Sequence, residues 1–148
     1  MERMEGGCSC NRVRFAISRP LFMLVCHCDA CKKRTGSAYG LSVAVDVDAV
    51  QTFTGAVTTF TRVGDSGRTV EYDFCANCGT TVRWRVGRMP NRVVFAGGAL
   101  DDTSKLKIGG EIYTREALPW ARFACDLSCS GAPEEEFRAE LAKRLQRA

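Results

Sequence analysis

Short stretches of alternating apolar and polar residues dominate the first hundred positions of the chain. Over residues 40–47 the apolar side chains recur at every second position, so a strand would place them all on one face. Similar stretches, bounded by turn residues, cover residues 13–17, 21–25, 57–63, 69–74, 81–86 and 92–96. The Gly-Asp-Ser-Gly sequence at 64–67 predicts a hairpin loop between two of them. The pattern is typical of a mainly β protein.

The last part of the chain has a different period. Phe137, Leu141 and Leu145 recur every four residues, as on one face of an amphipathic helix. Pro133 and three glutamates begin this segment and basic residues end it, which suits the helix dipole. We therefore expect a single β domain over residues 1–130 and a C-terminal helix within 131–148 that packs on the same domain.

Length and composition are those of an ordinary globular domain. The chain has 148 residues, of which 45% are hydrophobic and 26% charged. Its longest apolar run, residues 21–26, is far shorter than the roughly 20 residues that cross a bilayer. The first residues carry mixed charges and do not resemble a secretory signal. We expect a cytoplasmic protein, in which clustered cysteines are metal ligands more often than disulfides.

Cysteine provides the strongest chemical signal in the sequence. The chain has nine cysteines. Thiolates one or two residues apart can bind the same metal ion, and Zn²⁺ prefers such ligands. Seven of the nine cysteines fall into three clusters: Cys8 and Cys10; Cys26, Cys28 and Cys31; Cys75 and Cys78. Seven ligands predict one closed four-cysteine zinc site and one three-cysteine site with an open position.

The first and third clusters are expected to form the closed, structural site. Cys75-x-x-Cys78 is typical of a zinc knuckle, followed by Gly79, which tolerates a positive φ. Cys8 and Cys10 would supply the other two ligands, because a CxC pair on a strand points both side chains to the same face.

The middle cluster is expected to be the catalytic site. Cys26 and Cys28 would share a strand face, and Cys31 would follow a short turn. Three protein ligands leave one coordination position for water or substrate. A small-molecule thiol bound there would be held as a thiolate, whereas a free thiol with a pKa of about 8.5 is mostly protonated at neutral pH.

Three alternatives remain open for the metal ligands. His27 could complete the middle site, although on a strand it would point away from its cysteine neighbours. Cys125 or Cys129 could be the fourth ligand, or both could be small buried hydrophobes. All seven clustered cysteines could also serve a single site, with some left over.

Net charge gives little support for a polyanionic partner. The formal charge is +4, but seven thiolates and two Zn²⁺ ions would reduce it to about +1. The basic run Lys32-Lys33-Arg34 remains, and we interpret it as a solvated turn rather than a nucleic-acid patch.

The cysteine motifs and their order resemble the glutathione-dependent formaldehyde-activating enzyme family, which also includes centromere-protein-V-like zinc domains. The resemblance rests on residues 6–10, 26–36 and 75–80, and on the late segment 111–120. Two features depart from the family pattern. Asn11 stands where the family usually has glycine, and the tail after Trp120 matches no family motif.

The resemblance implies a β-tent fold, in which stacked antiparallel sheets are pinned by zinc. It implies a structural zinc on Cys8, Cys10, Cys75 and Cys78, and a second zinc on Cys26, Cys28 and Cys31. The implied activity is a carbon–sulfur lyase reaction, run towards S-(hydroxymethyl)glutathione from glutathione and formaldehyde. Lys32, Lys33 and Arg34 follow the open site and are candidates for contacts with the glutathione carboxylates.

Two other functions fit the same motifs. The domain could be a non-catalytic, zinc-stabilised binding module. It could also be a B-type methionine sulfoxide reductase, for which Cys125 or Cys129 would have to be the reactive cysteine.

Overall fold

The computed structural model describes residues 2–147 and has two β-sheets. The strands are β1 (Met4–Gly7), β2 (Arg14–Ile17), β3 (Phe22–Cys26), β4 (Gly40–Asp46), β5 (Val50–Thr54), β6 (Val57–Val63), β7 (Thr69–Cys75), β8 (Thr81–Val86), β9 (Arg92–Ala96) and β10 (Gly110–Ile112). The α-helices are α1 (Asp29–Thr35) and α2 (Glu135–Arg147). The predicted mainly β fold with a C-terminal helix is confirmed.

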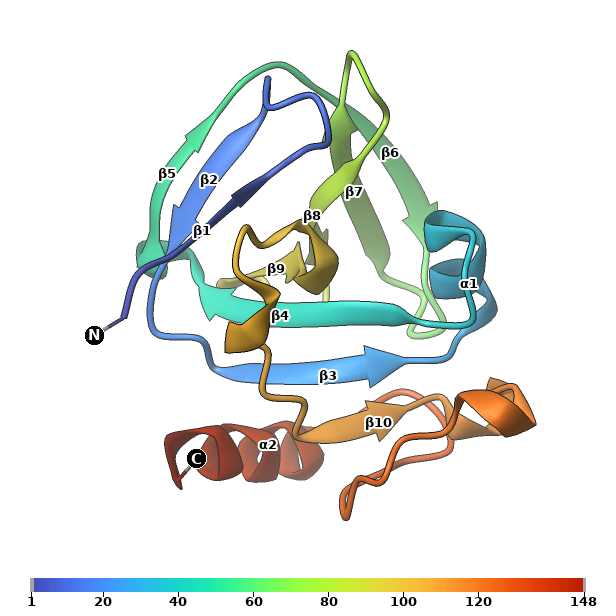
Figure 1. The fold of residues 1–148 in the computed structure, drawn as a ribbon. Helices are drawn as coiled ribbons and strands as arrows, with labels where there is room; N and C mark the ends of the chain where they lie inside the picture. Colours follow the sequence, from blue (N-terminus) through green and yellow to red (C-terminus); the bar gives the residue numbers. More distant parts are fainter. Residues whose placement is uncertain (1, 148) are drawn as a thin grey trace.

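The two sheets enclose the chain's interior like the sides of a tent (Figure 1). One sheet has the order β1-β2-β5, and the other has the order β10-β3-β4-β9-β8-β7-β6. Neighbouring strands are antiparallel except β10, which runs parallel to β3. In Figure 1 the larger sheet supplies both the base, with β3 and β4, and the sloping right side, with β6 and β7.

The apolar faces predicted from the alternation meet in the interior. Phe15 and Ile17 of the smaller sheet pack in one cluster with Val43, Val45 and Phe95 of the larger one. The rings of Phe15 and Phe95 lie 4.5 Å apart. Burial of these side chains supplies most of the driving force for closing the two sheets on each other.

Helix α2 covers the outer side of the base, below β3 and beside β10 (Figure 1). Leu141 is almost fully buried and belongs to the same cluster as Phe22 and Leu24 of β3. The close fit depends on Gly110, where a Cβ atom would approach Leu141 Cδ2 to 2.8 Å.

Two local predictions were wrong. Cys8 and Cys10 lie in the turn after β1 and not on a strand. Cys28 lies beyond the end of β3, and the expected short turn before Cys31 is the first turn of helix α1. At Cys8 and Cys28 the sulfur atom accepts a backbone hydrogen bond instead.

Candidate metal centres

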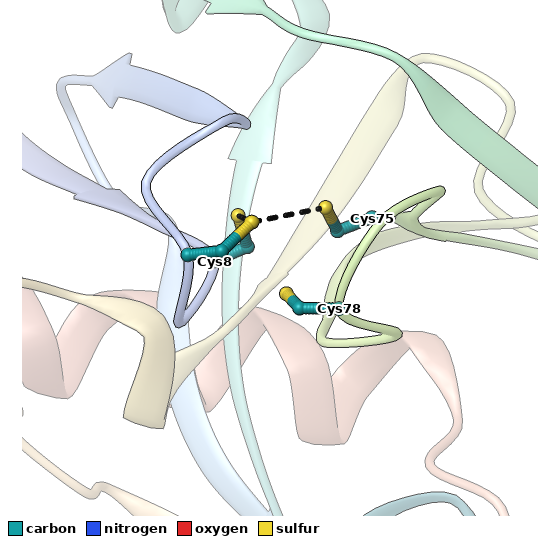
Figure 2. Close-up of side chains that lie close together, drawn as sticks. Cys8, Cys75 and Cys78 are labelled. Carbon is teal, nitrogen blue, oxygen red and sulfur yellow. Dashed lines mark hydrogen bonds between the residues drawn. The ribbon is translucent and has the colours of Figure 1, made fainter.

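Four cysteines from two facing loops meet at one end of the fold. Cys8 and Cys10 come from the β1–β2 turn, Cys75 ends β7, and Cys78 lies in the following turn. Their sulfur atoms all lie within 4.8 Å of one another. Figure 2 shows the side chains of Cys8, Cys75 and Cys78 pointing toward a common centre.

The spacing of these sulfurs fits a tetrahedral ion and not disulfides. With Zn–S bonds of about 2.3 Å, neighbouring sulfurs of a tetrahedral site lie about 3.8 Å apart. Cys8 Sγ lies 3.5 Å from Cys10 Sγ, which in turn lies 3.7 Å from Cys75 Sγ. A disulfide bond would need about 2.05 Å. The donor set therefore suits zinc.

Two tight turns bring the four sulfurs together. Asn11, with φ 61°, and Gly79, with φ 76°, both occupy the left-handed region. Each donates its backbone N–H to the carbonyl of the cysteine three or four residues earlier, Cys8 or Cys75. Asparagine is one of the few non-glycine residues that adopt this conformation readily, so Asn11 can form this turn.

Hydrogen bonds to the sulfurs favour the thiolate form that a metal requires. The backbone N–H of Val13 donates to Cys8 Sγ (3.2 Å), and that of Asn77 donates to Cys75 Sγ (3.4 Å). The Thr80 hydroxyl, 3.2 Å from Cys78 Sγ, lowers the pKa of that thiol to about 5. Such donors stabilise the charged sulfur directly.

The middle cysteines form a second, smaller cluster. Cys26 is the last residue of β3, Cys28 caps the N-terminus of α1, and Cys31 lies within that helix. Their sulfurs lie within 4.8 Å of one another, and all three side chains are largely buried. Cys28 Sγ accepts the backbone N–H of Cys31 at 3.3 Å, so the helix cap itself fixes one sulfur.

Charge is concentrated on one sulfur of this cluster. Hydrogen bonds from Cys26 and Cys28, helped by the nearby positive charge of Arg34, lower the pKa of Cys31 to about 3. Hydrogen bonds to Cys28 and Cys31, together with burial, raise the pKa of Cys26. The hydrogen bond with Cys26 lowers the pKa of Cys28, but the hydrogen bond with Cys31 and burial raise it overall. A metal ion that binds all three sulfurs would replace the remaining thiol protons.

The alternative ligands lie outside both clusters. His27 is fully buried, and its Nε2 is 3.0 Å from Glu111 Oε2. Cys129 Sγ donates to the Gly131 carbonyl at 3.1 Å, and Cys125 is half-buried elsewhere in the same loop. Within residues 2–147 the groups that could hold a metal ion contain only cysteines, four in one cluster and three in the other.

A cavity of about 150 Å³ opens beside the three-cysteine cluster. Cys26, Cys28 and Cys31 form part of its wall, together with side chains from β3, β7, β8 and β9. The four-cysteine cluster does not line this cavity. Only the middle cluster is therefore placed to meet a bound small molecule there.

The sequence model of the glutathione-dependent formaldehyde-activating enzyme family matches residues 3–116. The chain belongs to this family. The match includes all seven clustered cysteines and ends before Cys125, Cys129 and helix α2. A search of curated proteins finds no match.

A solved structure supports the fold independently. A crystal structure of a Rhodobacter sphaeroides protein matches with a TM-score of 0.54 and 19% sequence identity. The match covers 66% of this chain and 88% of that one.

No described helix of this family member is long and apolar enough to cross a membrane.

The basic run after the middle cluster is divided among three environments. Lys32 Nζ donates to the Glu116 carbonyl (2.8 Å) and pairs with Asp29 (2.9 Å), while Lys33 is exposed. The guanidinium of Arg34 lies over the Trp84 ring, 4.2 Å from its centroid. These three side chains do not line the cavity beside the cysteines, and their contact with glutathione stays a prediction.

Other side chains, not identified from the sequence, line that cavity. They include the cationic Arg62, Arg88 and Arg138 and the aromatic Tyr72, Trp84 and Tyr113. Tyr113 lies in the family-like segment 111–120, whereas the other five lie on a predicted strand, in a loop or on the C-terminal helix, with no motif around them. For Tyr72 and Trp84 the signal was the alternation of β7 and β8, which placed both on inward faces.

Proposed function

We propose that this protein binds zinc at both cysteine clusters and is a carbon–sulfur lyase acting on a glutathione–aldehyde adduct. The observation that carries the proposal is the position of three sulfurs in the wall of a cavity, with no fourth clustered ligand within residues 2–147. Family membership supports the same chemistry. The reducing cytoplasm is the matching compartment, since both clusters need reduced cysteines.

The two clusters are assigned different tasks. Cys8, Cys10, Cys75 and Cys78 would hold a structural zinc that ties the β1–β2 turn to the β7–β8 turn. Cys26, Cys28 and Cys31 would hold the second ion. With one position open, that zinc would keep the thiol of glutathione ionised at neutral pH.

The reaction is an addition without redox change. The sulfur of glutathione forms a bond to the carbonyl carbon, the C=O π bond opens, and the proton of the thiol ends on the oxygen. The chain's contribution is to position the two reactants next to each other. Arg62 and Arg88, in the cavity wall, can attract the carboxylates of glutathione.

The proposal is tested by the rate of adduct formation from glutathione and an aldehyde, measured above the spontaneous rate. Cys28→Ser should abolish the acceleration, keep the circular dichroism spectrum of the parent and reduce bound zinc from two ions to one. Cys129→Ser, which changes a cysteine outside both clusters, is the matched control and should retain activity and both ions.

Two outcomes would contradict the lyase assignment. If the parent protein gives no acceleration with both ions bound, it is a zinc-stabilised binding module. If Cys28→Ser unfolds the chain, the middle zinc is structural. Elemental analysis with and without glutathione adds a direct measure of whether the middle ion responds to the thiol.

A further inference from the structure

The cavity beside Cys26, Cys28 and Cys31 is mainly apolar. Leu24, Val94 and Trp84 form its inner wall and are each less than a tenth exposed. They belong to one continuous hydrophobic cluster with the three cysteines. The sulfurs thus face a space that favours hydrocarbon over water.

Several polar side chains around this space already have hydrogen-bond partners within the protein. Arg62 Nε donates to the Tyr72 hydroxyl at 3.0 Å. Arg138 donates to the Pro133 carbonyl and to Glu135, both at 2.6 Å. Burial and the neighbouring Asp65 carboxylate raise the pKa of Tyr113, which stays a neutral phenol. Among the buried side-chain nitrogens and oxygens of the wall, within residues 2–147, only Arg138 Nε lacks a partner.

Formaldehyde is too small to fill this cavity. The volume of about 150 Å³ is that of an apolar cavity that accommodates a benzene-sized group. Formaldehyde has no substituent on its carbonyl carbon and would leave most of the space empty. Empty apolar space gives no binding energy, because its lining atoms have no contacts on that side.

We infer that the aldehyde partner carries an apolar substituent of about four to six carbons, which occupies this cavity while its carbonyl group faces the three cysteines. The inference rests on the proposed function and narrows its substrate. Sulfur adds to the carbonyl carbon of this aldehyde, and the thiol proton passes to its oxygen. The product is a redox-neutral thiohemiacetal.

Binding can be tested without catalysis, because one of the two tryptophans lies in the cavity wall. Trp84 is 6% exposed there, whereas Trp120 is 77% exposed elsewhere. Zinc-loaded Trp120→Phe protein should show a saturable change in Trp84 fluorescence with benzyl alcohol, an unreactive probe with a phenyl group. Methanol, which has the size of formaldehyde, should give no saturable change.

A cavity-narrowing variant localises the probe. Ala132, in the loop before α2, lines the cavity, and Ala139 lies exposed on α2. Ala132→Leu should weaken benzyl alcohol binding at least tenfold, and Ala139→Leu should leave it unchanged. Ser42→Met, which fills the cavity from β4, provides a second test if the loop variant is poorly folded.

The second test compares the activity of the protein toward aldehydes of different length. Burial of each methylene is worth about fourfold in affinity, so kcat/KM should rise roughly 10- to 60-fold from acetaldehyde to pentanal, which has three more methylenes. Equal values for the two aldehydes, or equal probe binding by Ala132→Leu and Ala139→Leu, would overturn the inference. Benzyl alcohol binding without acceleration of either aldehyde would overturn the proposed lyase function and leave an apolar ligand site.

Discussion

His27 and Glu111, which are 84 residues apart in the sequence, share a fully buried hydrogen bond of 3.0 Å. A carboxylate can only accept, so Nε2 of His27 carries the proton. Glu111 also accepts from Arg122 Nε (2.8 Å) and from the Phe123 backbone N–H (2.5 Å). One carboxylate therefore ties the residue between Cys26 and Cys28 to the segment that follows β10.

Removing this carboxylate should loosen the middle metal site. Glu111→Ala leaves buried donors unpaired, and we expect a loss of about 3 kcal/mol in the free energy of unfolding. Zinc affinity of the middle site should fall about tenfold, because Glu111 holds His27 in place between the ligands Cys26 and Cys28. Urea unfolding and a competitive chelator titration measure the two effects. Glu136→Ala, on the exposed face of α2, should change neither.

The four-cysteine cluster should be essential for stability. Cys75→Ser removes a buried sulfur that joins two loops, so we expect one zinc equivalent to be lost and the Tm to fall by at least about 10 °C. Differential scanning calorimetry with elemental analysis tests this. Cys125→Ser should keep both the metal content and the Tm. A Cys75→Ser protein with unchanged Tm would show that this cluster does not stabilise the fold.

Arg34 should strengthen metal binding at the middle cluster by its charge. It stacks on Trp84, its positive charge lies near Cys31, and two of its buried nitrogens lack a hydrogen-bond partner. Arg34→Gln should weaken zinc binding by about 10- to 100-fold, because three thiolates then lose a compensating cation. Arg34→Lys should recover part of the loss. Lys33→Gln, one residue earlier and exposed, is the control, and equal affinities of the Lys33 and Arg34 variants would refute this role.

Asp73 should make the fold sensitive to acid. This buried carboxylate contacts Arg83 Nε (2.8 Å), Arg85 Nη1 (3.1 Å) and the Thr59 hydroxyl (2.7 Å). Although burial opposes ionisation, these partners lower its pKa below the ordinary 3.8. Its stabilising contribution is therefore complete above that value and is lost as the pH falls through the lower, folded-state pKa.

Comparison with Asp73→Asn isolates this effect from metal release. The variant should be less stable than the parent by about 2 kcal/mol at pH 7, and the difference should shrink below pH 4. Urea unfolding at several pH values measures it. A difference that stays constant from pH 7 to pH 3 would contradict the assignment.

Alternation of apolar residues was sufficient to predict most strands. The predicted stretches 57–63, 81–86 and 92–96 coincide with β6, β8 and β9, because their ends are marked by turn residues. The cysteine clusters could also be grouped correctly as four and three, since ligand spacing along the chain limits which sulfurs can meet.

The missed elements are short or depend on distant partners. β10 has only three residues, Gly-Glu-Ile, and is held by parallel pairing with β3. The local sequence has no pattern that predicts this pairing. The glutamate of β10 is fully buried, against the usual preference of that residue for solvent. Helix α1 was not predicted, although Asp29, the basic residues 32–34 and Gly36 are all helix-end signals.

The parallel pairing of β10 with β3 also has a consequence for how molecules of this protein behave toward one another. All five side chains of β3 are buried, and β10 covers the strand's outer backbone groups along Leu24, Val25 and Cys26. A chain shortened to residue 109 would leave this apolar strand as an open sheet edge, ready to pair with a second molecule. The last forty or so residues therefore prevent self-association by covering the edge of β3, and shortened forms should aggregate.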